Sequence, residues 1–252
     1  MKTKPSSKKF RRRFAPHPLL AGADPKTGFP EPILRQTARV RQVGFSCVKR
    51  MPSYLQFLRV LQAAGNDCVS GTVLAGVHNL KPVIVRKDLA KTGAVGIPRI
   101  GFQIPELSAA IERFLGWDNQ TKAVLVGVGN LGKALLGYQG FQNFGFRIVG
   151  AFDQNPRMVG KWVHGRKVQA MHQLIPFVAR GEILLGVLTV PASAAQAAAE
   201  LMVQAGVNGI WNFTPVQLQL PDEVVSQKED LAEGLAVLFH RLHRLNSHAK
   251  SV

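Results

Sequence analysis

The chain has 252 residues, of which 46% are hydrophobic, and 32 Lys or Arg stand against 15 Asp or Glu, a formal net charge of +17. This length and apolar content suit two small folded domains, and no apolar run approaches the roughly 20 residues that cross a bilayer. The basic start lacks the apolar core of a secretion signal, and Cys47 and Cys68 fit no metal-binding or redox spacing. We therefore expect a cytoplasmic protein with no membrane contact and no metal ion.

The positive charge is concentrated in the N-terminal half of the chain. Residues 1–45 carry eleven Lys or Arg against two acids, whereas residues 119–230 carry nine against seven. An uneven basic excess of this kind is typical of a nucleic-acid-binding segment that precedes a nearly neutral ligand-binding domain.

Residues 1–45 show no hydrophobic periodicity, and the prolines that follow the basic run at residues 8–13 break any helix. We expect a mostly disordered arm. The arm either contacts phosphates without sequence specificity, or it is a solvated tail or the product of a start codon set too far upstream.

Residues 46–118 carry the pattern of three short helices and a hairpin. The first helix is expected from about Met51–Pro52 to Gly65, with an apolar stripe of Tyr54, Leu55, Leu58 and Leu61. A second helix is capped by Ser70 and carries Val73, Leu74 and Val77, and a turn at residues 78–80 precedes a third helix begun by Pro82 and ended by residues 92–94. Residues 96–104 alternate as a β-hairpin.

This order is typical of a winged helix-turn-helix, whose third helix enters the major groove of double-stranded DNA. Arg86 and Lys87 of that helix, Lys81 just before it and Arg99 on the hairpin are then the candidate DNA-binding residues. A small helical dimerisation or linker domain has a similar pattern, and the charges near Arg86 are also compatible with a solvated face.

The second half, residues 119–228, opens on a strand, a glycine turn, a helix and a second strand. The apolar run 123–126 is followed by Gly127-Val128-Gly129-Asn130-Leu131-Gly132, and residues 146–152 end in Asp153. The helix is expected to bury one face made of Leu131, Ala134, Leu135 and Tyr138. Strand, glycine turn and helix in this order predict a Rossmann (doubly wound parallel sheet) α/β domain.

The glycines of this turn and Asp153 are the residue types that bind a dinucleotide. Gly127 permits the tight turn, Gly129 lets the backbone approach a pyrophosphate, and Gly132 allows close packing of helix on strand. Asp153 accepts hydrogen bonds from an adenosine ribose and repels a 2′-phosphate, which favours NAD(H) over NADP(H). The alternative for the glycines is a merely tight structural turn, and the alternative for Asp153 alone is a helix cap before Pro156.

Later segments complete the expected sheet. Residues 161–168 predict an irregular strand pair, 182–190 and 207–213 predict strands, and 192–201 predict an alanine-rich helix. Val190-Pro191 and Asn212-Phe213 then lie at the carboxyl edge, where doubly wound folds bind ligands, although a proline there also simply ends a strand.

Residues 229–252 predict a single C-terminal helix with an apolar stripe. Its leucines recur at spacings of four and three: Leu231, Leu235, Leu238, Leu242 and Leu245. Such a stripe fits packing within the chain and dimerisation equally well.

The chain resembles the family of redox-sensing transcriptional repressors called Rex over about residues 48–245. The resemblance rests on an ordered set of segments: Tyr54-Leu55, residues 85–89, residues 126–132, Gly140-Phe141, Phe152-Asp153, residues 189–191, residues 194–196 and residues 211–215. It implies a homodimer with an N-terminal winged helix, a C-terminal Rossmann domain and a C-terminal helix exchanged between subunits. It also implies that operator DNA is bound in the NAD⁺ state and released by NADH.

The resemblance implies further roles and exposes departures. Leu231 is expected to enter the neighbouring subunit near its nicotinamide, with Val190, Pro191, Asn212 and Phe213 beside the ring. The family has an Arg where this chain has Gln56, and that Arg takes part in a polar switch with residues matching Tyr138 and Asp230. Residues 97–102 lack a glycine of the family's wing, and Trp211 replaces an aliphatic residue.

Two other functions fit parts of the sequence. An NAD-dependent oxidoreductase needs an acid–base group near the nicotinamide, and the candidates are His164, His172, His240 and His243. A nucleotide-binding module without specific DNA affinity, such as a CoA-binding one, needs no basic N-terminal half. We expect a regulator rather than an enzyme.

Overall fold

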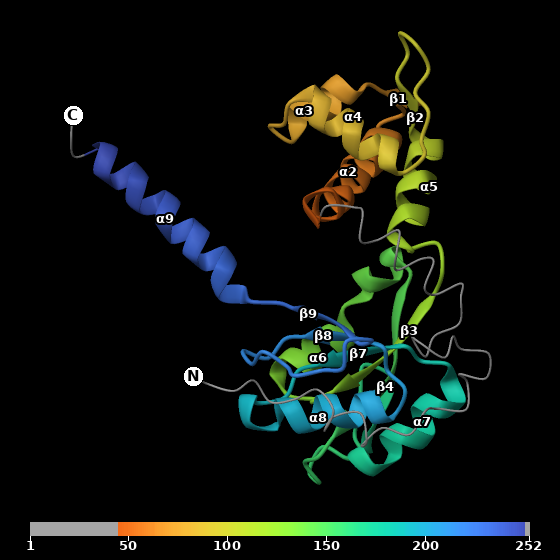
Figure 1. Ribbon diagram of the computed structural model, residues 1–252, viewed down its shortest axis with the longest axis vertical. Helices are drawn as coiled ribbons and strands as arrows, with labels where there is room; N and C mark the ends of the chain where they lie inside the picture. Colours follow the sequence, from red (N-terminus) through yellow and green to blue (C-terminus); the bar gives the residue numbers. More distant parts are fainter. Residues whose placement is uncertain (1–44, 250–252) are drawn as a thin grey trace, which may run out of the picture. The chain divides into compact units, whose positions relative to one another are not determined.

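The computed structural model of the protein describes residues 45–249, with side chains for 46–230 and 232–243 (Figure 1). These residues form two compact units, the first made of residues 45–120 with 143–145, and the second of residues 121–142 with 146–249. No helix in this described range is long and apolar enough to cross a membrane. The predicted arm, residues 1–45, lies almost wholly outside the described residues.

The first unit is helical with a small two-stranded sheet. Its elements are α2 (Phe45–Ala63), β1 (Cys68–Val69), α3 (Gly71–Val77), α4 (Pro82–Lys91), β2 (Phe102–Gln103) and α5 (Ile104–Leu115). The core is built from buried side chains of all four helices, including Leu58, Leu74, Leu89 and Ile111. Ser70 caps α3 by accepting from the N–H of Val73 at 3.2 Å, and Pro82 stands at the start of α4, as predicted.

The start of the first helix was predicted wrongly. α2 begins at Phe45, six residues before Met51, and contains Pro52 in its interior. An interior proline costs about 3 kcal/mol because it removes a hydrogen bond and crowds the preceding turn. Cys47 and Met51 continue the buried stripe of Tyr54 and Leu58 on the other side of Pro52, and their packing outweighs that cost.

The predicted second helix, α3, buries Leu74 and Ala75, whereas Val73 and Val77 are about half exposed. The hairpin is shorter than predicted, with one bridge between Ile97 and Gly101, and β2 pairs with β1, which the sequence pattern did not reveal. α5 was also not predicted.

The second unit contains a seven-stranded sheet in the order β5-β6-β4-β3-β7-β8-β9. The strands are β3 (Thr121–Val126), β4 (Phe146–Asp153), β5 (Trp162–Val163), β6 (Arg166–Ala170), β7 (Leu185–Leu188), β8 (Gly209–Asn212) and β9 (Val225–Lys228). Every neighbouring pair is parallel except β5–β6, which is a hairpin. The predicted Rossmann architecture is confirmed, whereas β9 was not expected.

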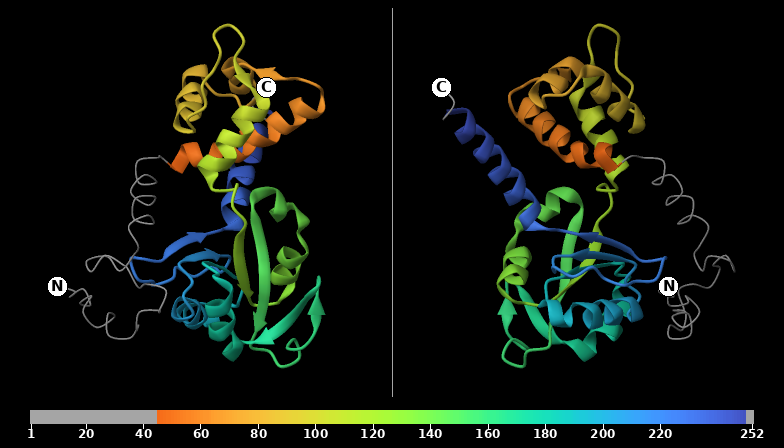
Figure 2. Two further views of the ribbon diagram at one scale, coloured as in Figure 1. Left: turned by 90° about the vertical axis from the view of Figure 1, so that its right-hand side faces the viewer. Right: turned by 60° about the vertical axis from the view of Figure 1, so that its left-hand side comes forward.

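Helices cover both faces of this sheet (Figure 2). The helical elements are α6 (Asn130–Gly137), η3 (Gln139–Phe144), η4 (Met171–Gln173), α7 (Leu174–Gly181) and α8 (Ala192–Gln204). One core lies under α7 and α8, with Val178, Ala199 and Met202, and the other includes Leu135 and Leu136 of α6. α7 was not predicted from the sequence.

The buried face of α6 was predicted wrongly in part. Gly132 is buried, and Leu135 and Leu136 pack against the core, whereas Leu131 is 37% exposed and Ala134 is exposed. Tyr138 lies just beyond the helix end and is 55% exposed. The close approach of α6 to its strand explains the difference, because it brings Gly132 rather than a large side chain against the sheet.

The C-terminal helix, α9 (Leu231–Ala249), follows β9. Every side chain of residues 232–243 is exposed, including Leu235, Leu238 and Leu242. The alternative of packing within the chain is therefore not observed for these residues. The side chains of Leu231 and Leu245 lie outside the described ones.

Candidate nucleotide and DNA binding sites

The glycine turn lies at the point where the strand order reverses. From β3 the chain runs to β4 and β6 on one side of the sheet, and then returns to β7 and β8 on the other side. The loop after β3 therefore lies beside the loop after β7, and Thr189 donates its N–H to the carbonyl of Val126 at 2.9 Å. Such a switch point is where doubly wound sheets bind ligands.

The glycines of this turn have three different geometries. Gly127 has φ +100°, and a Cβ there would lie 2.7 Å from the Thr189 carbonyl oxygen. A Cβ on Gly132 would collide with the Gly127 carbonyl, whereas a Cβ on Gly129 would meet nothing within 4 Å. The turn is therefore tightly packed at Gly127 and Gly132 and open at Gly129. At Gly129, the free N–H groups at the start of α6 can bind a phosphate.

Asp153 ends β4 beside the glycine turn. Its carboxylate accepts from the N–H of Val128 at 2.7 Å and from the N–H of Asn155 at 2.8 Å. Each oxygen still has a lone pair for a ribose hydroxyl, because a carboxylate can accept about four hydrogen bonds. No helix follows at Pro156, so the alternative of Asp153 as a helix cap is wrong.

Thr189 is a residue of this site to which the sequence pattern gave no separate role. Its hydroxyl donates to the carbonyl of Gly127 at 2.6 Å and lies 3.2 Å from that of Val126. Val190 and Pro191 follow directly, and a Cβ on Gly127 would lie 2.8 Å from the Val190 side chain. Thr189 therefore joins the two loops on which the predicted ligand residues lie. The position of Thr189, a hydroxyl residue directly after a buried strand, is the sequence feature from which this role could have been predicted.

Asn212 and Phe213 lie at the end of β8, as predicted. Asn212 is 1% exposed, and its side chain donates to the Val216 carbonyl and accepts from both the N–H and the hydroxyl of Thr214. Its side chain therefore organises the loop, and its role as a cofactor residue stays a prediction. Phe213 packs on Trp211 with ring centroids 4.7 Å apart, and the Trp211 indole donates to Glu229 at 3.0 Å.

The third helix of the first unit has one exposed and one buried side. Val83, Arg86, Lys87 and Ala90 are exposed, whereas Val85, Asp88 and Leu89 are buried. Lys81 precedes the helix and is exposed, and Arg99 stands at the exposed tip of the hairpin with φ +67°. The four predicted DNA-binding cations are thus all open to solvent.

Asp88 is not part of a solvated charged face. It is 3% exposed, accepts two hydrogen bonds from Arg50 at 2.7 and 2.9 Å, and accepts a third from the Tyr54 hydroxyl at 3.0 Å. Burial alone raises the pKa of Asp88, but hydrogen bonds from Arg50, Cys47 and Tyr54 outweigh it and hold that pKa below its usual value.

The pKa values of two groups that contact Asp88 are also shifted. Burial, together with the hydrogen bond to Asp88, raises the pKa of Cys47 to about 11 and that of Tyr54 to about 12. Cys47 is therefore a neutral buried thiol. This cluster, which we call the Asp88 cluster (Cys47, Arg50, Tyr54 and Asp88), fixes α4 on α2, and sequence reasoning missed it.

The residues of the expected polar switch have separate surroundings. Gln56 is exposed on α2 in the first unit, and Tyr138 packs edge-on against Phe141 in the second. Asp230 caps α9 by accepting from the N–H of Ala232 at 2.9 Å and lies 3.6 Å from the Lys228 ammonium. The role of these three residues stays a prediction, and the side chain of Leu231 lies outside the described ones.

The two units together define a DNA-binding protein of the winged-helix class joined to a nucleotide-binding Rossmann sheet. Two family models match the chain in the same order. The one described as "Putative DNA-binding protein N-terminus" covers residues 45–90, and the one described as "CoA binding domain" covers residues 118–216.

Curated relatives narrow this class to one family. The redox-sensing transcriptional repressor Rex of Treponema denticola is 45% identical over 191 residues, which are 76% of this chain and 91% of that protein. The Rex of Porphyromonas gingivalis is 36% identical over 219 residues, which are 87% of this chain and 94% of that protein. The chain belongs to the Rex family of redox-sensing transcriptional repressors.

Solved structures agree with this assignment. The Rex-family repressor RSP, in complex with β-NAD⁺ and operator DNA, has a TM-score of 0.76 and 31% identity, covering 82% of this chain and 96% of that one. The same repressor in complex with β-NADH has a TM-score of 0.75 and 29% identity, covering 84% and 99%.

Proposed function

We propose that this protein is a transcriptional repressor whose binding to double-stranded operator DNA is controlled by NAD⁺ and NADH in the cytoplasm. One observation supports the proposal above all others. This chain, a member of the Rex family, has both the exposed basic side of α4 and the glycine turn at the switch point of the sheet. Solved complexes of the related RSP contain operator DNA with NAD⁺ in one case and NADH in another.

The dinucleotide residues have distinct tasks in this proposal. The pyrophosphate lies over Gly129 and the start of α6, and the Asp153 carboxylate accepts from the adenosine ribose. Val128, Asn130 and Leu131 complete the loop. The nicotinamide lies near Val190, Pro191 and the half-buried ring of Phe213.

The two redox states of the ring differ in charge and planarity. A ligand shifts a two-state equilibrium only by its differential affinity for the two states. The neutral dihydronicotinamide ring of NADH suits an apolar surrounding better than the cationic ring of NAD⁺, since burying an unpaired charge is costly. We propose that Phe213, Val190 and the partner subunit's Leu231 provide that surrounding, and that NADH stabilises the dimer conformation that does not fit the operator.

The relatives are named as repressors, and we propose that this chain is likewise not an enzyme. His164, His172, His240 and His243, the candidate acid–base groups, are all exposed. His164 stands on the β5–β6 hairpin with φ +44°, beside Gly137 rather than in the loops after β7 and β8. An exposed imidazole at such a position is poorly placed to take up a proton from a substrate beside the nicotinamide.

The function is tested by fluorescence anisotropy with a palindromic Rex-family operator duplex at fixed salt. We expect tight binding with NAD⁺ and release by NADH, despite the exchange of the family's Arg for Gln56. Arg86→Ala should weaken binding to the operator by about 10-fold or more and binding to unrelated DNA by much less. Operator binding that is indifferent to both nucleotides would show that the sensor function is absent, and no specific binding would overturn the repressor function.

We also propose a homodimer in which α9 is exchanged between subunits. Leu235, Leu238 and Phe239 are 49%, 51% and 59% exposed within one chain, and contiguous apolar surface of this kind is typical of an interface. The stripe repeats every three or four residues, as packing against a partner helix or domain requires.

Replacing Leu235 and Leu238 together by Ser is expected to convert the protein to monomers. Burial of each leucine contributes about 1.5–3 kcal/mol, so the dimer dissociation constant should rise by more than about 100-fold. Light scattering after gel filtration measures the mass, and His240→Ser, on the opposite side of α9, is the matched control. A double variant that keeps the wild-type mass would show that the stripe does not form the interface.

A further inference from the structure

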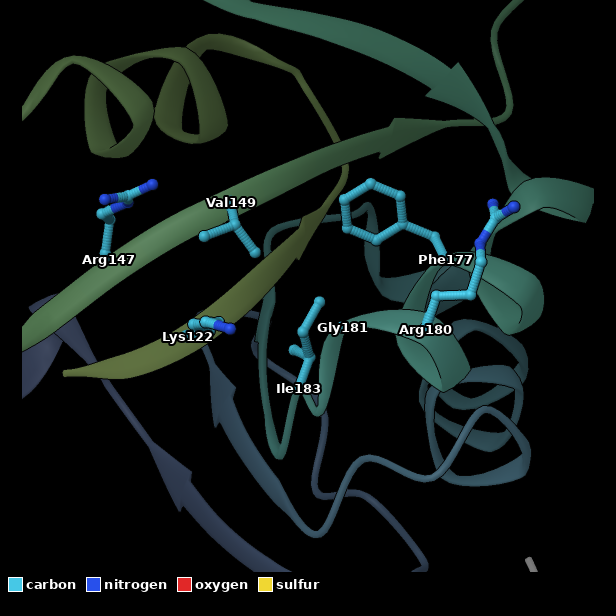
Figure 3. Close-up of a pocket in the computed structure, with 7 residues that line it drawn as sticks. All are labelled: Lys122, Arg147, Val149, Phe177, Arg180, Gly181 and Ile183. Carbon is cyan, nitrogen blue, oxygen red and sulfur yellow. The ribbon is translucent and has the colours of Figure 1, made fainter. Parts of the chain in front are cut away.

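A hollow of about 400 Å³ lies in the second unit at the amino-terminal edge of its parallel strands, opposite the glycine turn. Its walls come from β3, β4, α7 and the start of the segment that leads into β7. The side chains that line it include Lys122, Arg147, Val149, Phe177, Arg180 and Ile183 (Figure 3). The volume is within the range of small-molecule sites, about 300–1,000 Å³.

Three cations surround this hollow without an acidic side chain among its lining residues. Lys122 and Arg147 are register partners on adjacent parallel strands, so they extend from the same face of the sheet about 4.8 Å apart along the hydrogen-bonding direction. Arg180 comes from the last turn of α7, and Figure 3 shows it across the hollow from the other two.

None of these cations is neutralised by an ion pair within residues 45–249. Like charges directly opposite on neighbouring strands destabilise a sheet. Lys122 and Arg147 therefore repel each other, and a bound anion would remove that repulsion.

The surface between the cations is apolar and contains an aromatic ring. Phe177 is half-buried, and its ring lies against Gly150, where an added Cβ would be only 2.6 Å from the ring. The ring also packs edge-on against Phe152, with centroids 5.3 Å apart. The ring is thus held in one position, with Val149 and Ile183 completing an apolar floor.

We propose that this hollow is a second nucleotide site, which binds a nucleoside polyphosphate. Its phosphates lie among Lys122, Arg147 and Arg180, which are the donors that bind phosphate most often. Its base lies on the apolar floor beside Phe177, because a planar ring packs favourably against an aromatic side chain. The three cations surround a concavity of small-molecule size instead of forming a row along a surface, which favours this ligand over a nucleic-acid backbone. The site is separate from the dinucleotide edge and does not depend on the proposed repressor function.

The test is calorimetric titration of the full chain with ATP, in saturating NADH so that the glycine turn is occupied. We expect one ATP per chain, and at least a tenfold loss of affinity in the double variant Arg147→Gln/Arg180→Gln. The matched control Lys161→Gln/Lys167→Gln removes two exposed cations of the same unit outside the hollow and should stay within about twofold of wild type. All four side chains are exposed, so the fold should survive both changes.

A second titration separates the phosphates from the base. Inorganic tripolyphosphate should bind the wild type about tenfold more weakly than ATP, and Phe177→Leu should reduce this difference. Absence of ATP binding up to about 5 mM, equal affinity in wild type and the Arg147/Arg180 variant, or equal binding of ATP and tripolyphosphate would each overturn the proposal. If the wild type does not bind ATP and the Arg147/Arg180 variant loses operator affinity, the hollow is a DNA contact, and the nucleotide-site proposal is equally overturned. Operator release by NADH, measured on the same samples, reports separately on the repressor function.

Discussion

Replacing Asp88 by Ala is expected to destabilise the first unit by about 3 kcal/mol and to abolish specific DNA binding. Removing one partner of a buried ion pair costs about 3–5 kcal/mol, because the other charge is left without compensation. The lower value applies here, since the Arg50 side chain is 29% exposed and can regain some water, whereas that of Asp88 is 4% exposed. Tyr54 also loses its hydrogen-bond acceptor.

Hydrogen exchange of the native chain, followed on peptides from α2 and α4, measures this loss without unfolding the second unit. Amides that exchange by opening of the first unit should exchange roughly 100-fold faster in the variant. Asp67→Ala replaces an exposed acid of the same unit and should leave exchange unchanged. Unchanged protection in Asp88→Ala would show that the Asp88 cluster does not hold α4.

The pH dependence of the same unit follows from the pKa of Asp88. Because the folded chain lowers this pKa, the unfolded chain binds the proton more tightly. The stabilisation is complete above the usual carboxyl pKa of about 4 and is lost as the pH falls through that value towards the lowered one. Burial also lowers the pKa of His78, so that its contribution is lost in a separate window, as the pH falls below about 6.5. Only the window near pH 4 should disappear in Asp88→Ala.

The Asp88 cluster also shows what a sequence pattern can and cannot reveal. Val85, Asp88 and Leu89 share one side of α4, so the pattern places an acid within an apolar stripe. The identity of its partner was not predictable, because Arg50 is 38 residues away and lies in a turn of α2 that precedes Pro52. Proline marked a helix start in the sequence, whereas tertiary packing of Cys47 and Met51 extended the helix past it.

The Rossmann half was more predictable because its signals are local. Strand, glycine turn and acid follow one another within about 30 residues, and each depends on backbone geometry that few residue types permit. Elements without such a signal were missed. The strand β9 carries Val-Ser-Gln-Lys, with three exposed residues, and only its pairing with β8 makes it a strand. The role of Asn212 within its own loop likewise depends on Thr214 and Val216, which share no pattern with it.

Replacing Gly129 by Ala is expected to prevent release of the operator at the NADH concentration that releases it from the wild type, while leaving the fold and operator binding intact. The φ of Gly129 is −75° and its ψ −163°, an extended conformation that alanine adopts freely, and its Cβ would meet nothing within 4 Å. The added methyl group therefore costs the protein nothing by itself. It occupies the space through which a pyrophosphate approaches the backbone, so the affinity for NADH should fall by about 2–3 kcal/mol, or roughly 30- to 150-fold.

Variants at two glycines of the turn, Gly129 and Gly132, and at Gly76 outside it distinguish this explanation from simple loss of structure. Gly132→Ala brings a Cβ against the Gly127 carbonyl, so it should lower the melting temperature as well as the NADH affinity. Gly76→Ala makes the same chemical change within helix α3, again with nothing within 4 Å, and should lower neither of them. NADH fluorescence titration, thermal melting and operator anisotropy on the three variants separate these effects. If Gly129→Ala keeps its melting temperature but stays on the operator in NADH, the signal that releases the DNA begins with the pyrophosphate bound at this turn. If that variant responds to NADH at the wild-type concentration, the dinucleotide binds elsewhere, and the open space at Gly129 has no part in sensing.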